Sequence, residues 1–152
     1  HLRQALAHAR SGNASRADEH IDAAHHLIAA GIPAHPYCTV TANAANADIH
    51  WVAVAVELDD AATALARAEQ VKIPTGEQPA RIGRYFIDLA RAQALHGDHT
   101  QALDALHQAH AIAPQLVRYH PQAHETVAFL AETQRRDPDS LAGFARWISP
   151  HV

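Results

Sequence analysis

The spacing of alanine and large apolar residues over residues 81–114 is the feature that most constrains the fold. Apolar residues recur there every three or four positions in two runs, as they do on one face of an α-helix. The tripeptide His96-Gly97-Asp98 separates the runs. Gly97 can take the left-handed conformation that ends a helix, and Asp98 can cap the next one. Pro114 is placed to end the second helix, so residues 81–113 are predicted to form an antiparallel helix pair.

A triplet of small, large and small apolar residues lies on the second helix of this pair and recurs along the chain. The three copies are Ala17/Ile21/Ala24, Ala61/Leu65/Ala68 and Ala102/Leu106/Ala109. Each triplet is predicted to face inward, and each is expected on the second helix of a pair. The recurrence predicts a single domain over residues 1–152, with helix pairs at about 2–30, 38–72, 81–113 and 120–149 stacked in series.

Composition supports an all-α fold of about eight helices. Alanine accounts for 35 of the 152 residues, and it is the best helix former. No stretch alternates convincingly between apolar and polar residues, as a half-buried strand would. The helix predicted from Tyr37 or Thr41 to Leu58 is apolar on more than one side, which is typical of a helix buried between neighbours.

Charge and cysteine content argue against several classes of protein. The net charge is −4 with 12 Lys and Arg residues, which disfavours direct nucleic-acid binding by this chain. The single cysteine, Cys38, cannot form an internal disulfide, so a reducing, cytoplasmic location is expected and the thiol is expected to be inert. The longest apolar run, 51–56, is too short to span a bilayer. A helical pattern already begins at residue 2, so the natural protein is expected to start further upstream.

Fourteen histidines raise the question of a metal site or an enzyme. The close sets are His20/His25/His26, His107/His110 and His120/His124. A metal site needs three or four ligands, and no set has a nearby cysteine to complete it. No local nucleophile–base arrangement and no glycine-rich phosphate loop is present. The sequence therefore predicts no metal, no cofactor and no enzymatic activity, with a histidine-based metal protein or enzyme as the less favoured alternative.

A stack of helix pairs offers a concave surface lined by the first helix of each pair, and this surface is the candidate binding site. The polar residues predicted to face it are Asn43, Asn46 and His50 on the second pair, Arg84, Asp88 and Arg91 on the third, and Arg118 before the fourth. Amide, imidazole and guanidinium groups could hold a peptide carboxylate or another anion by charge-assisted hydrogen bonds. The alternative is that these are solvated polar faces, with Arg84 and Asp88 forming an i,i+4 pair.

The segment 81–114 resembles the tetratricopeptide repeat. The positions that carry the resemblance are Phe86, Leu89, Ala90, Gly97, Ala102, Leu106, Ala109 and Pro114, and Gln93 departs from it because an aromatic residue is usual there. The intervals between the triplets, 44 and 41 residues, exceed the roughly 34 residues of a standard repeat. The resemblance implies a right-handed solenoid of degenerate repeats.

The second half of the chain is similar to the C-terminal part of actinobacterial helix-turn-helix regulators of the XRE type. The matching pieces are Arg81, Arg84, Asp88-Leu89-Ala90-Arg91-Ala92, Ile112-Ala113-Pro114 and Val117-Arg118-Tyr119-His120-Pro121. This resemblance implies a regulatory module whose DNA-binding domain is absent from this chain. It would bind a peptide, a small effector or a protein partner, and a homodimer is among the arrangements it implies. The alternative is a stand-alone scaffold for protein–protein interaction.

Overall fold

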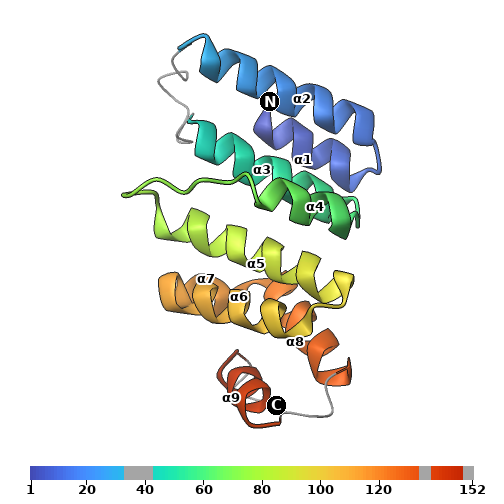
Figure 1. Ribbon diagram of the computed structural model, residues 1–152, viewed down its shortest axis with the longest axis vertical. Helices are drawn as coiled ribbons and strands as arrows, with labels where there is room; N and C mark the ends of the chain where they lie inside the picture. Colours follow the sequence, from blue (N-terminus) through green and yellow to red (C-terminus); the bar gives the residue numbers. More distant parts are fainter. Residues whose placement is uncertain (33–42, 134–137, 149–152) are drawn as a thin grey trace. The chain divides into compact units, whose positions relative to one another are not determined.

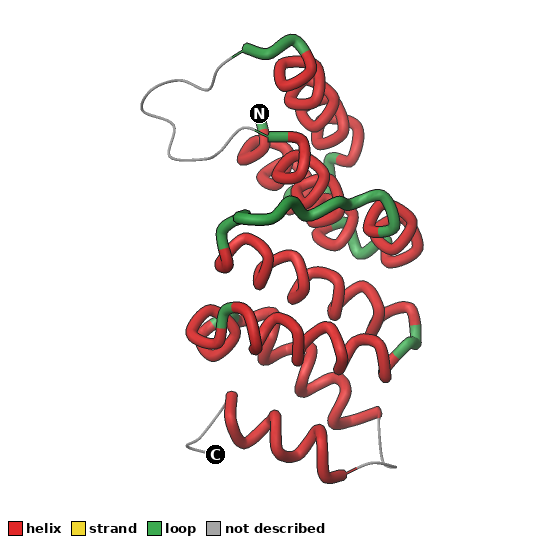
Figure 2. Tube along the Cα trace, turned by 60° about the vertical axis from the view of Figure 1, so that its left-hand side comes forward, coloured by secondary structure: helices red, strands yellow, loops and turns green. Residues whose placement is uncertain are grey.

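The computed structural model describes residues 1–32, 43–133 and 138–148, without the side chains of residues 138–142. Within these ranges the chain forms nine helices and no strand, which confirms the all-α prediction (Figure 1, Figure 2). The helices are α1 (Leu2–Arg10), α2 (Ala14–Ala29), α3 (Ala44–Glu57), α4 (Ala61–Ala68), α5 (Pro79–His96), α6 (His99–Ile112), α7 (Pro114–Tyr119), α8 (Pro121–Thr133) and α9 (Pro138–Ile148). Cys38 lies outside the described residues.

The chain divides into two compact units, His1–Thr75 and Gly76–Val152. Helices α1 to α4 belong to the first unit and helices α5 to α9 to the second. In the first unit α1 packs against α2 and α3 against α4, and in the second unit α5 packs against α6. The single domain and the right-handed solenoid remain predictions.

The first unit is built around α3, which packs against α1, α2 and α4. Nine of its 14 residues are buried, so the prediction of a helix apolar on more than one side is confirmed. The buried core contains Ala5, Ala9, Ala17, Ile21 and Val54, with Trp51 packed against it. The first triplet, Ala17/Ile21/Ala24, is buried as predicted because α2 presents it to its neighbours.

The triplet on α4 differs from the prediction. Ala61, Leu65 and Ala68 are only partly buried, whereas Ala64 is fully buried. Among the helices of this unit, α4 has its extensive packing with α3 alone, so a single narrow stripe is covered. The periodicity therefore identified the helix correctly but not the residue at the centre of its buried face.

The second unit is centred on the α5–α6 pair, joined by the predicted turn. Gly97 has φ 94°, in the left-handed region that ends α5. Ala102, Leu106 and Ala109 are all fully buried, so the inward position of the third triplet is confirmed. Around them lies a core shared by α5 to α9. Its other large members include Ile87, Val117, Leu130, Phe144 and Ile148.

The helix starts follow local capping chemistry. The side chains of Asn13, Asn43 and Asp60 each accept a hydrogen bond from the backbone N–H three residues later, at the starts of α2, α3 and α4. Asp98 lies at the predicted cap position of α6, but its side chain makes no capping bond. The predicted starts of α3 at Tyr37 or Thr41 lie outside the described residues, and the helix begins at Ala44.

A short helix that the sequence did not predict accounts for the count of nine. Pro114 was expected to end α6, and it also starts α7, where it occupies the first turn. A proline is favourable there because the first backbone N–H groups of a helix have no partner within that helix. The helix α7 brings Val117 into the core and positions the start of α8 beside α5.

Candidate functional site

Arg84 is the centre of a polar cluster that joins α5 to the start of α8. Its Nε donates to both carboxylate oxygens of Asp88 at 3.3 Å. Its Nη1 lies 2.8 Å from Nε2 of His120, and its Nη2 donates to Oε1 of Gln122 at 3.1 Å. The i,i+4 pair of Arg84 and Asp88 is therefore confirmed.

Burial makes this cluster different from a solvated surface pair. The side chain of Asp88 is 3% exposed and that of Arg84 is 33% exposed. A carboxylate removed from water is costly unless it is paired and hydrogen-bonded, and Arg84 supplies such a pair. The guanidinium is thereby held by groups of its own chain. A ligand-binding role for Arg84 and Asp88 stays a prediction, and the contacts give them a structural one.

Tyr85, the next residue, is buried in the same part of α5. Its side chain is 7% exposed, and its ring lies 5.3 Å from the ring of Phe86. Burial raises the pKa of the Tyr85 phenol, because the charged phenolate is disfavoured away from water.

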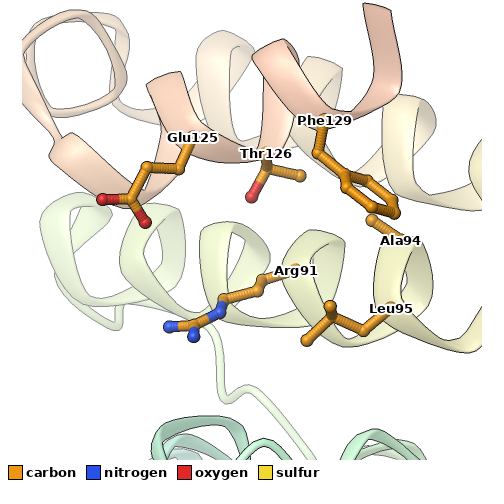
Figure 3. Close-up of a pocket in the computed structure, with 6 residues that line it drawn as sticks. All are labelled: Arg91, Ala94, Leu95, Glu125, Thr126 and Phe129. Carbon is orange, nitrogen blue, oxygen red and sulfur yellow. The ribbon is translucent and has the colours of Figure 1, made fainter. Parts of the chain in front are cut away.

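Arg91 lies two turns further along α5 and lines a pocket between α5 and α8. The pocket has a volume of about 140 Å³, and its lining is almost wholly apolar. The lining residues, which define the α5/α8 pocket, are Arg91, Ala94, Leu95, Glu125, Thr126 and Phe129 (Figure 3). Because the lining is so apolar, Arg91 and Glu125 contribute mainly their aliphatic stems to it.

The two helices present the same pattern to this pocket. On α5, Arg91 is followed four residues later by Leu95, and on α8 Glu125 is followed four residues later by Phe129. The helices run in the same direction, so both charged side chains lie at one end of the pocket and both large apolar ones lie toward the other (Figure 3). Leu95 is 48% exposed and Phe129 37% exposed, so this apolar surface faces solvent in the isolated chain.

The other predicted residue of the second unit, Arg118, lies on α7 and is partly buried. Its backbone carbonyl accepts a hydrogen bond at 2.7 Å from Nε2 of His124 on α8. Arg118 does not line the α5/α8 pocket.

The predicted residues Asn43, Asn46 and His50 lie in the first unit, at the start of α3. The side chain of Asn43 accepts from the backbone N–H of Asn46 at 2.7 Å, which caps the helix. Asn46 is fully buried. Nδ1 of His50 lies 2.8 Å from the carbonyl oxygen of Asn46, one turn earlier on the same helix. These contacts explain why the polar residues are found there, and ligand binding by them stays a prediction.

A second arginine cluster holds the first unit together. Arg67 on α4 donates from Nη1 to the carbonyl of Trp51 at 2.8 Å and from Nη2 to Asp18 at 3.1 Å. Its guanidinium carbon lies 4.8 Å from the centre of the Trp51 ring, a cation–π arrangement. Arg67 thus joins α2, α3 and α4.

The described residues contain no group of three or more His, Cys, Asp and Glu side chains placed to hold a metal ion. Several histidines instead contact aromatic rings: His107 and His110 lie beside Phe144, and His110 also lies beside Trp147. Over the same part of the chain, no helix combines the length and the apolar character that crossing a bilayer requires.

Sequence reasoning found part of the α5/α8 pocket and missed the rest. Arg91 was predicted as a site residue, whereas Leu95, Thr126 and Phe129 were not. The i,i+4 pattern of a charged and a large apolar residue on both α5 and α8 could have indicated them. What the pattern could not give is that α5 and α8 are neighbours, since 30 residues separate Leu95 from Glu125.

Comparison with known proteins gives no match for this chain, whether with protein families, with curated proteins or with solved structures. The function is therefore inferred from the geometry within each unit.

Proposed function

We propose that this chain is a protein-binding module, and that the α5/α8 pocket takes an apolar side chain of the partner. The observation that carries the proposal is the pocket itself, where Leu95 and Phe129 expose apolar surface beside a hollow lined by Ala94 and Thr126. Exposed apolar surface next to charged groups is typical of protein-interaction sites.

The size of the pocket favours a side chain over a free effector. Its volume is about 140 Å³. A protein cavity of about 150 Å³ holds a molecule of the size of benzene, whereas pockets for drug-sized ligands span about 300–1,000 Å³. A pocket of this size has room for one leucine, isoleucine or phenylalanine side chain of a partner.

The energetics also favour a partner that makes contacts beyond the pocket. Burying one such side chain contributes about 1.5–3 kcal/mol, and exposed ion pairs with Arg91 or Glu125 would each add about 0–1 kcal/mol. A dissociation constant of 1 mM already requires about 4 kcal/mol. An isolated amino-acid-sized ligand would bind weakly, whereas a peptide or protein can add contact area along α5 and α8.

We further propose that this protein-binding module is part of a transcriptional regulator. Residues 81–121 resemble the tetratricopeptide-like C-terminal part of XRE-type regulators, in which partner binding would bias a separate DNA-binding domain. A stand-alone scaffold would use the same pocket without that domain. A gene sequence that continues upstream into a helix-turn-helix pattern would favour the regulator, and one without such a pattern would favour the scaffold.

Selection from a random peptide library tests the pocket directly. The full chain is expected to enrich peptides with one large apolar residue, and Phe129→Ser should weaken their binding about tenfold or more, because the apolar wall of the pocket is lost.

Ile112→Ser is the matched control, because Ile112 and Phe129 are both 37% exposed and Ile112 does not line the pocket. Circular dichroism should show both variants folded. Selected peptides that bind Phe129→Ser as tightly as the wild type would reject the pocket as the binding site.

A further inference from the structure

The charged and apolar residues of the α5/α8 pocket form a pattern that is complementary to itself. Seen along the helices, α5 presents Arg91 and then Leu95, and α8 presents Glu125 and then Phe129 (Figure 3). At each level the two helices therefore offer a matched pair: opposite charges at one end and two large apolar side chains at the other.

A two-fold axis that lies along the pocket, parallel to α5 and α8, would bring these pairs together between two copies. Such a rotation places α5 of one copy opposite α8 of the other and keeps the order of residues along both helices. Arg91 would then face Glu125 of the partner subunit, and Leu95 would face the partner's Phe129. Each contact occurs twice, as in any isologous interface.

We propose that the partner in the α5/α8 pocket is a second copy of this chain, joined through a two-fold interface of α5 and α8. This proposal rests on the proposed protein-binding function of the pocket and names its partner. The four charges of the two copies would alternate in sign around the axis, so each lies next to charges of opposite sign only. The arrangement is compatible with an ion pair between Arg91 and Glu125 inside one copy.

The other two-fold arrangement of the same surface is disfavoured by its charges. An axis across the helices would place α5 opposite α5 in reverse order, so Arg91 would meet Leu95 of the partner subunit. Charged groups of one copy would then be desolvated against apolar groups of the other, which costs free energy and gains no new charge pair between the copies. Charge complementarity thus selects the axis along the helices.

The interface between the two copies would be small. A standard interface uses about 20–30 residues on each side, more than the pocket itself supplies. We therefore expect a reversible dimer whose population rises with protein concentration, and which weakens at high salt because the charge pairs lie at the rim.

Charge reversal gives a test that is specific to this geometry. Sedimentation velocity of the full chain should show a monomer–dimer equilibrium. Arg91→Glu alone would place two carboxylates opposite each other in both symmetry-related contacts, and Glu125→Arg alone would place two guanidinium groups there. Each variant should raise the dissociation constant of its own homodimer about tenfold or more.

Mixing the two variants should restore the dimer. In the mixed pair, both contacts between positions 91 and 125 join a glutamate to an arginine, so a heterodimer forms where neither homodimer does. The double variant Arg91→Glu/Glu125→Arg should also dimerise, which shows that the single variants lost pairing and not folding. Glu132→Arg is the matched control, because Glu132 is exposed on α8 outside the pocket and its reversal should leave the dimer unchanged.

A wild-type chain that is monomeric at every concentration would overturn the second copy as partner, and so would a dimer that the single reversals leave intact or that mixing fails to restore. These outcomes differ from failure of the proposed function. A monomer that still binds library peptides in a Phe129-dependent way keeps the pocket as a binding site for another protein.

Discussion

The Nη1 atom of Arg84 lies 2.8 Å from the Nε2 atom of His120, across the junction of α5 with the start of α8. A guanidinium group can only donate hydrogen bonds, so Nε2 of His120 is the acceptor and the ring proton is assigned to Nδ1. Together with the bonds from Arg84 to Asp88 and Gln122, this contact fixes α8 beside α5. The α5/α8 pocket lies further along the same two helices, so its shape depends on this junction.

Arg84→Ala is expected to lower the free energy of unfolding by about 3 kcal/mol, because it removes the guanidinium that donates to both oxygens of the buried carboxylate of Asp88. Urea denaturation followed by circular dichroism measures the loss. Arg16→Ala is the control. It breaks an arginine–carboxylate pair with Glu19 whose side chains are 63% and 57% exposed, and such pairs contribute about 0–1 kcal/mol. Equal effects of the two substitutions would contradict the structural role of Arg84.

Gly83→Ala is expected to destabilise the second unit. A Cβ at position 83 would lie 2.7 Å from Cβ of Ala113 and 3.3 Å from Cδ2 of Leu116. Overpacking of this kind costs about 1–3 kcal/mol, which outweighs the gain of about 1 kcal/mol from replacing glycine inside a helix. The urea midpoint should therefore fall.

Gly143→Ala on α9 should instead raise the urea midpoint in the same experiment. No described atom lies within 4 Å of the added Cβ, so only the helix propensity changes. Two substitutions of the same kind that shift the midpoint in the same direction would contradict the close approach of α5 to Ala113.

Arg67→Lys is expected to destabilise the first unit by about 2 kcal/mol. Lysine keeps the charge, but it cannot donate at once to the Trp51 carbonyl and to Asp18 from a planar fork. The fluorescence of Trp51 in a Trp147→Phe background reports the unfolding of this unit. A lysine variant with wild-type stability would show that the charge alone, and not the geometry of the guanidinium, holds α4 to α2 and α3.

The cap of α4 predicts a dependence of stability on pH. The bond from the backbone N–H of Thr63 lowers the pKa of Asp60 below the ordinary value of 3.8. A carboxylate whose pKa is lower in the folded state stabilises the protein above the unfolded pKa and loses this effect as the pH falls. The melting temperature of wild type should therefore exceed that of Asp60→Ala most clearly near neutral pH, and the difference should shrink as the pH is lowered below about 3.8.

Asp98→Ala is the control for this experiment. Asp98 occupies the same cap position on α6, but its side chain makes no capping bond. Its replacement should change the melting temperature less near neutral pH. A pH-independent difference between wild type and Asp60→Ala would contradict the charged cap.

The sequence by itself determined the helical class, the α5–α6 turn and the inward triplets on α2 and α6. These features depend on contacts within a few residues: the left-handed conformation at Gly97, and apolar residues on one face of a helix. The residues that make these contacts are close together in the sequence, so the apolar pattern and the helix propensities are sufficient to predict them.

Only the tertiary structure decided which polar residues are buried and which residues form a pocket. Arg84 was predicted to face a ligand, whereas its contacts with His120 and Gln122, 36 and 38 residues away, engage it within the chain. Leu95 and Phe129 became one surface because α5 and α8 are neighbours, a relationship between helices that neither segment contains. The spacing of apolar residues determines which face of a helix is apolar. Which helix packs against that face depends on packing over the whole unit.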